Sequence, residues 1–189
     1  MQDKGGDTHA LEGYVYLALF TACIPAANWL IGNVGTICVP NGPCLIPVAP
    51  GLSAPSGVLM IGLALVLRDL VQRRLGVPWA VGAIIGGAIL SAAFAPASLV
   101  AASAAAFLLS EFADMAVYTP LQRKRLVLAV FASSVVGLVV DSIVFLYLAF
   151  GSLDYLAGQI VGKAWMVVLA LPIIRWLKRR DERPHLALS

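Results

Sequence analysis

The chain of 189 residues is 60% hydrophobic and 12% charged, with a formal net charge of +3 and a mean hydropathy of +0.91. A soluble domain has about 45–50% apolar and about 25% charged residues. One soluble core of this size could not bury so much apolar surface, so the composition predicts an integral membrane protein. It excludes soluble catalysis and aqueous nucleic-acid binding as primary functions.

Six apolar segments are long enough for membrane helices, because a span needs about 20 apolar residues. They cover about residues 11–34, 53–71, 78–95, 98–118, 126–150 and 155–177. We therefore predict an all-α bundle of six transmembrane helices that forms a single domain over residues 1–189.

Lysines and arginines occupy alternate ends of these segments. Arg73 and Arg74 follow the second segment, residues 123–125 follow the fourth, and a basic tail at 178–189 follows the sixth, whereas the first, third and fifth gaps contain no lysine or arginine. Basic residues collect on the cytoplasmic side of membrane proteins. We therefore expect both termini to be cytoplasmic, with the basic tail as a topology anchor.

The first gap, residues 35–55, reads "GTICVPNGPCLIPVAPGLSAP" and contains five prolines and no charge. It is too interrupted for a helix and unusually apolar for a free loop, and irregular backbone at membrane depth must be buried in protein or line a cavity. We expect an outer loop that either packs over one mouth of the bundle or serves as an ordinary connector. Cys38 and Cys44 could form a disulfide there in an oxidising compartment.

Several polar side chains fall inside the predicted spans, where a charge costs about 2.5–3.5 kcal/mol on insertion scales and usually faces the bundle interior. They are Asn28, Arg68, Asp69, Glu111, Asp114, Asp141, Gln159 and Lys163. Similar depths suggest that Asp141 pairs with Lys163 and Arg68 with Glu111. Asp69 is expected to be an interfacial charge. Asp114 is expected to lie nearer the membrane surface than Glu111 and to be more easily solvated.

The stretch "GAIIGG" at Gly82–Gly87 has the small-xxx-small pattern that permits close helix approach. It favours packing within one subunit, and a homodimer seam is the second interpretation. The chain has no His-Glu-x-x-His motif, no histidine in a predicted span and no cysteine–histidine cluster with metal-ligand spacing. The sequence therefore favours a small solute carrier without a metal or cofactor over an enzyme.

Five stretches together resemble one family, the queuosine-precursor transporters, also grouped as vitamin-uptake-transporter (VUT) or YhhQ-like proteins. The stretches are "PAANWLIGN", "LVLRDLVQRRLG", "SEFADMAVYTPL", "ASSVVGLVVDSIVFLYLAFG" and "GQIVGKAWM". One departure is Ser134, where many relatives would have asparagine. The resemblance implies a multi-pass protein of the bacterial inner membrane that imports 7-cyano-7-deazaguanine or a related 7-deazaguanine or queuine, with the lipid bilayer and a deazapurine base as its partners and no nucleic acid.

A guanine-like edge offers N–H donors to a carboxylate and acceptors to an amide. The expected substrate-binding residues are therefore Asn28, Glu111, Asp141, Gln159 and Lys163, and the expected gate or proton path contains Arg68, Asp114 and Tyr118. Which acid reads the base, and whether import is proton-coupled, stay open. Two other functions also stay open: the substrate-binding subunit of an energy-coupling-factor (ECF-type) vitamin transporter, and a membrane scaffold with structural ion pairs.

Overall fold

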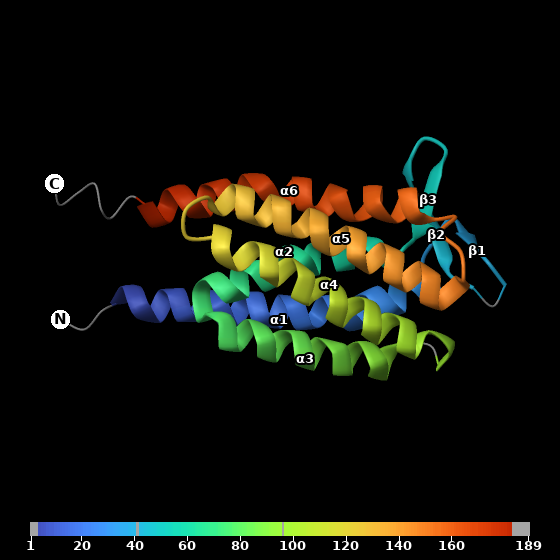
Figure 1. The fold of residues 1–189 in the computed structure, drawn as a ribbon, viewed down its shortest axis with the longest axis horizontal. Coiled ribbons are helices and arrows are strands. Elements are labelled where there is room, and N and C mark those ends of the chain that lie inside the picture. Colours follow the sequence, from blue (N-terminus) through green and yellow to red (C-terminus); the bar gives the residue numbers. More distant parts are fainter. Residues whose placement is uncertain (1–3, 41, 96, 183–189) are drawn as a thin grey trace.

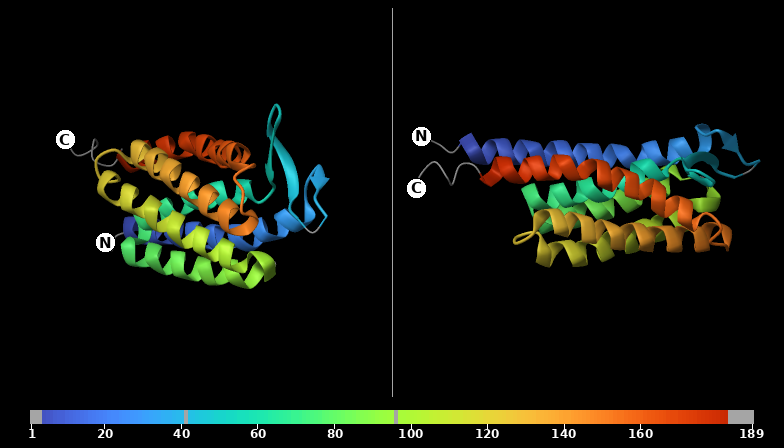
Figure 2. Two further views of the ribbon diagram at one scale, coloured as in Figure 1. Left: turned by 45° about the vertical axis from the view of Figure 1, so that its right-hand side comes forward. Right: turned by 90° about the horizontal axis from the view of Figure 1, so that it is seen from above.

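The computed structural model describes residues 4–40, 42–95 and 97–182, which contain six α-helices and one small sheet. The helices are α1 (Lys4–Asn33), α2 (Val58–Leu75), α3 (Val77–Phe94), α4 (Val100–Leu121), α5 (Leu126–Phe150) and α6 (Leu156–Glu182), and a 3₁₀ turn at Ala97–Leu99 precedes α4. The helices run along one long axis, so that α1 begins and α6 ends at the same end of the bundle (Figure 1). The sheet lies at the opposite end, as the two views of Figure 2 also show.

Five helices in the described part of the chain are long and apolar enough to cross a membrane, namely α1 from Thr8 onward and α3 to α6. The exception is α2, which carries Arg68, Asp69, Arg73 and Arg74. This helix packs against all five others, so that Arg68 and Asp69 are buried in protein. The structure thus has five helices with the properties of membrane spans. The second predicted span, at residues 53–71, and the cytoplasmic location of the termini stay predictions.

Two helices are longer than their apolar segments. Helix α1 begins at Lys4 instead of about residue 11, and α6 continues to Glu182 instead of about residue 177. Polar side chains join the two extensions, because Arg180 donates to both carboxylate oxygens of Glu12 at 2.6 and 2.8 Å. The first part of the predicted basic tail is therefore helical, and residues 183–189 lie outside the described residues.

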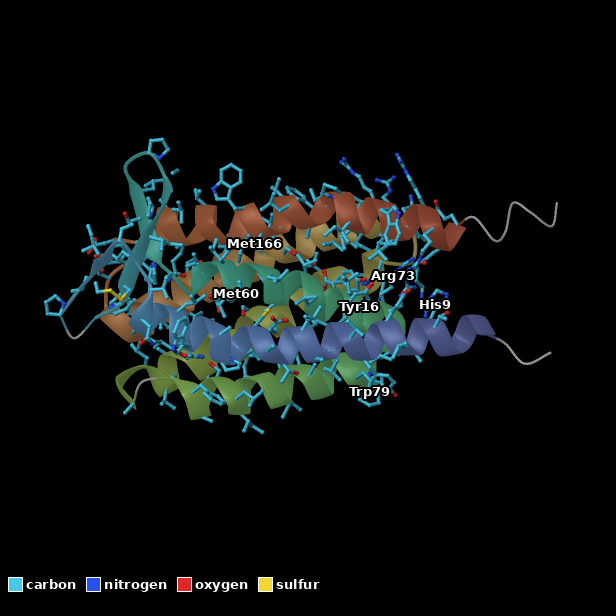
Figure 3. The ribbon with its side chains drawn as sticks, turned by 180° about the vertical axis from the view of Figure 1, so that it is seen from behind. His9, Tyr16, Met60, Arg73, Trp79 and Met166 are labelled. Atoms are coloured by element: carbon cyan, nitrogen blue, oxygen red, sulfur yellow. A yellow bond between two sulfur atoms is a disulfide. The ribbon has the colours of Figure 1, made fainter. Side chains whose placement is uncertain are left out.

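The proline-rich segment is a sheet and not the irregular loop that its composition predicted. Strands β1 (Ile37–Cys38), β2 (Cys44–Ala49) and β3 (Leu52–Pro55) form an antiparallel sheet in that order. Proline removes a ladder donor and is tolerated at bulges, and the β2–β3 register shifts between Pro47 and Ala49. Cys38 and Cys44 lie opposite each other in β1 and β2 and form a disulfide, drawn in yellow in Figure 3.

The sheet packs onto the end of the bundle and is not a detached connector. Strands β2 and β3 contact α6, and β2 also contacts α1. The indole nitrogen of Trp165 donates to the carbonyl oxygen of Val48 at 2.9 Å. This packing fixes the end of β3, from which the chain enters α2 beside the cavity described below.

The glycine stretch in α3 has two different environments. A Cβ on Gly87 would come within 2.6 Å of Phe107 Cζ, so this glycine lets α3 and α4 pack closely inside the subunit. A Cβ on Gly82 or Gly86 would meet no atom within 4 Å. Both line a surface groove beside Trp79, which projects from α3 in Figure 3. Internal packing therefore holds only for Gly87 among these three glycines, and the homodimer seam stays a prediction.

Candidate functional site

A cavity of about 60 Å³ lies inside the bundle near the sheet. Residues of all six helices and the end of β3 line it. Four of the five predicted substrate-binding residues are among them, namely Asn28, Asp141, Gln159 and Lys163. The structure thus brings together side chains that lie far apart in the sequence.

A lysine organises the polar side of this cavity. The ammonium group of Lys163 donates to Asp141 Oδ2 at 2.6 Å, to Ser142 Oγ at 2.7 Å and to Gln159 Oε1 at 2.7 Å. An ammonium has three donors, so all of them are used, and the side chain is 1% exposed. The predicted Asp141–Lys163 pair is confirmed, and its carboxylate neutralises a charge that burial would otherwise make costly.

Close packing of α2 on α6 holds this lysine in place. A Cβ on Gly62 would lie 2.6 Å from the carbonyl oxygen of Lys163 and 2.9 Å from its Cα. Only glycine leaves room for the two backbones at this point. Gln159 lies one turn before Lys163, which places both side chains on the cavity face of α6.

Several hydrogen-bonding groups around the cavity stay available. Asn28 donates to Ile24 O at 3.0 Å, which leaves its amide oxygen free to accept. Gln159 uses its oxygen on Lys163, which leaves its amide nitrogen free to donate. Ser91 and Ser103 also line the cavity, and neither has a side-chain hydrogen bond within the described part of the protein. Together these groups offer donors and acceptors to one bound molecule.

The remaining wall is apolar and partly aromatic. Phe107, Phe145, Val58 and Ile61 line it. Small-molecule sites typically combine such walls with a few placed polar groups. Sequence reasoning missed Ser91, Ser103, Phe107 and Phe145, because single serines and phenylalanines inside apolar segments carry no signal that separates lining from packing.

A second buried polar cluster surrounds Arg68. Its Nε donates to Glu111 Oε2 at 3.0 Å, which confirms the predicted Arg68–Glu111 pair. Its Nη2 donates to Asp114 Oδ1, its Nη1 donates to Gln72 Oε1 at 3.3 Å, and its Nη1 lies 2.9 Å from Asp69 Oδ1. Arg68 and both aspartates are 0% exposed, and Glu111 is 2% exposed.

The Arg68 cluster differs from the sequence prediction at both aspartates. Asp69 was expected at the interface, yet it is fully buried and accepts a hydrogen bond from Ser133 at 3.0 Å. Asp114 was expected to be more easily solvated, and it is fully buried as well. Both expectations were wrong because they used depth along a helix alone. Helix α2 contacts all five other helices, so Asp69 is enclosed by protein, and Asp114 on α4 is buried against Arg68 of this central helix.

Glu111 lies in the Arg68 cluster and does not line the cavity. Phe107, one turn earlier on α4, does line it, so the Arg68 cluster and the cavity meet α4 at residues about 6 Å apart along the helix axis. Tyr118 also joins the Arg68 cluster, because Arg68 Cζ lies 5.8 Å from the centre of its ring. Ser134, the departure from the family pattern, is buried and does not line the cavity.

Ion pairs also join the helix ends near the termini. Arg74 binds Glu12 at 3.0 Å and Asp181 at 3.0 Å, and Arg73 binds Asp181 at 2.7 Å. Arg73 lies at this end of the bundle in Figure 3. With Arg180 on Glu12, these contacts tie α1, α2 and α6 together on the side away from the cavity.

Residues 90–177 match the model of a family described as "Putative vitamin uptake transporter". The matched stretch runs from the end of α3 into α6 and contains Glu111, Asp141 and Lys163, whereas Asn28 and Arg68 precede it. No curated protein and no solved structure matches the chain significantly.

Proposed function

We propose that this chain, a multi-pass membrane protein related to the vitamin uptake transporters, imports a queuosine precursor across the bacterial inner membrane. The family description is that of a transporter and not of an enzyme. The proposed substrate is 7-cyano-7-deazaguanine or a related 7-deazaguanine or queuine. The observation that carries the proposal is the cavity that combines aromatic walls with unused hydrogen-bonding groups of Asn28, Asp141 and Gln159.

The chemistry of a 7-deazaguanine fits this set. Its guanine-like edge offers N–H donors, and Asp141 has an oxygen that Lys163 does not use. Its ring carbonyl can accept from the amide nitrogen of Gln159, and a ring N–H can donate to the amide oxygen of Asn28. Analogues that lack these groups would leave buried polar atoms unpaired, which gives strong discrimination. Asp141 is therefore the acid proposed to bind the N–H groups of the base. Glu111 lies one turn of α4 beyond the cavity-lining Phe107 and is proposed to assist from the Arg68 cluster.

Import requires the cavity to open. Its volume of about 60 Å³ is well below the roughly 300–1,000 Å³ of a typical ligand pocket. Pro55, the last residue of β3, and Gly57, which directly precedes α2, line the cavity on the side of the sheet. We propose that movement of the sheet end admits the base and that the ion pairs near the termini close the other side. Arg68, Asp114 and Tyr118 would then lie on the gate or proton path between the two ends.

Binding to the detergent-purified full chain tests the proposal. A ligand at a hundred times its Kd stabilises the folded state by about 2.7 kcal/mol. We expect 7-cyano-7-deazaguanine to raise the melting temperature, guanine to raise it less, and biotin and riboflavin to have no effect. Asp141→Asn should abolish the shift, and Asp154→Asn, the same change at an exposed site, should preserve it. No shift with any deazaguanine would refute the proposed substrate class.

Transport by the chain alone separates a secondary transporter from the two alternative functions. A secondary transporter moves labelled substrate into liposomes without another protein, whereas an energy-coupling-factor subunit binds substrate but needs an ATPase module. A scaffold protein would do neither. Uptake by the purified chain, lost in Asp141→Asn and kept in Asp154→Asn, would support the transporter.

A further inference from the structure

The charges of the Arg68 cluster do not balance. Three carboxylates, those of Asp69, Glu111 and Asp114, contact Arg68, the one cation that pairs with them within the described residues. All four side chains are at most 2% exposed. Full ionisation would leave a net charge of about −2 in a region without solvent, and buried charges without partners are strongly disfavoured. At least one carboxylate of this cluster therefore holds a proton.

The contact between two of the acids indicates where that proton lies. Asp69 and Asp114 contact the two terminal nitrogens of the same guanidinium group, Nη1 and Nη2 of Arg68, which brings their carboxyl groups close together. An ionised carboxylate can only accept, so a hydrogen bond between the two carboxyl groups requires a proton on one of them. Asp69 Oδ1 and Asp114 Oδ2 are buried without a hydrogen-bond partner among the described residues. A shared proton would satisfy both groups.

A tyrosine that packs on Arg68 has a hydroxyl group that is unpartnered within the described part of the chain. Tyr118 is 0% exposed, its ring packs on Arg68, and its hydroxyl has no hydrogen-bond partner among the described residues. The hydroxyl of Ser134, on α5, is likewise buried without a partner. Burying a hydroxyl unpaired costs free energy. The Tyr118 hydroxyl is a group that could donate to a carboxylate whose proton leaves, which a purely static ion-pair cluster would not need.

The polar surroundings of the two acids come from three helices. Helix α2 supplies Arg68 and Gln72, with Arg73 at a greater distance. Helix α4 supplies Glu111, Tyr118 and Thr119, and α5 supplies Ser133, with Asp141 beyond Glu111. Helix α6 faces α2 here through Val167, Ala170 and Ile174, which are apolar. Arg68 is therefore the cation that compensates these acids at short range.

We propose that Asp69 and Asp114 form a proton-binding site that couples proton entry to substrate import, an inference that rests on the proposed function. A proton from the outer solution forms an O–H bond on one of the two carboxyl groups, and the same bond breaks when the proton leaves toward the cytoplasm. Glu111 links this site to the cavity, because it binds Arg68 and follows Phe107 by one turn of α4.

The test uses Asp69→Asn and Asp114→Asn in the full chain, with Asp154→Asn as the control. Asparagine has the shape of a protonated aspartic acid and can donate to the remaining carboxylate, so the contact survives without a titratable proton. Proteoliposomes with an imposed pH gradient should accumulate 7-cyano-7-deazaguanine several-fold with wild type and the control. Both cluster variants should only equilibrate it, and they should still exchange internal for external substrate. Accumulation by Asp69→Asn under the pH gradient would overturn the coupling.

A second readout does not depend on the substrate. The infrared C=O stretch of a protonated carboxylic acid should be present in the wild-type protein at neutral pH, persist in Asp154→Asn, and disappear in Asp69→Asn and Asp114→Asn. An unchanged band in both cluster variants would refute the proton site even if import holds. Loss of the band in the cluster variants, with no deazaguanine binding by wild type, would instead refute the proposed substrate and leave the proton site intact.

Discussion

Removing Lys163 should destabilise the bundle strongly, and removing its partner as well should restore much of the loss. Lys163→Met leaves Asp141 as a buried carboxylate that is 7% exposed and deletes three hydrogen bonds of 2.6–2.7 Å. Breaking a buried ion pair from one side costs about 3–5 kcal/mol. For a chain of this size about 1 kcal/mol corresponds to roughly 2–4 °C, so the melting temperature should fall by roughly 6–20 °C.

The double variant Asp141→Leu with Lys163→Met removes both charges. Replacing a buried pair by apolar groups of similar volume is often neutral or stabilising, so a double-mutant cycle should show a coupling of about 0.5–3 kcal/mol or more. Unfolding of the detergent-solubilised protein, followed by circular dichroism, measures all four corners. A single variant within about 1 kcal/mol of wild type, or a double variant as unstable as the sum of the singles, would refute this reasoning. Substrate binding should be absent in the double variant even where its stability recovers.

Three further outcomes follow from the fold. Gly62→Ala should destabilise the protein by about 1–3 kcal/mol through overpacking against Lys163, whereas Gly86→Ala, which points into an open groove, should be neutral or slightly stabilising; equal melting temperatures would contradict this. Reducing the disulfide between β1 and β2 should cost about 2 kcal/mol and lower the melting temperature, and an unchanged value would show that helix contacts alone hold the sheet. Arg180→Gln should cost at most about 1 kcal/mol because its pair with Glu12 is partly exposed, yet hydrogen exchange at the ends of α1 and α6 should rise.

Spacing and depth were enough to predict the two main ion pairs. Asp141 and Lys163 lie at similar depth on neighbouring helices, and a buried charge within reach of an opposite one will pair. The same holds for Arg68 and Glu111. These predictions succeeded because the bilayer removes solvent as a competing partner, which leaves few alternatives for each charge.

Lateral position was the information that the sequence lacked. The burial of Asp69 and the place of Glu111 outside the cavity both depend on which helix lies at the centre of the bundle. The composition of α2 shows that it is not a typical membrane span, but it does not show that the other helices enclose it. The sheet was missed because prolines masked the strand pattern, and its bulge is a feature of pairing and not of composition. Ser91 and Ser103 became candidates only when a cavity could be seen beside them.

The two buried clusters together favour a transporter over a scaffold. A scaffold gains little from buried ion pairs, since apolar replacements are often at least as stable, and an excess of carboxylates around Arg68 makes the cluster a poor structural device. Lys163 is fully satisfied, yet the amide oxygen of Asn28 and the amide nitrogen of Gln159 beside it are left unused at a cavity. Unused polar groups and unbalanced acids both cost stability, and a substrate for the first and a proton for the second would account for that cost.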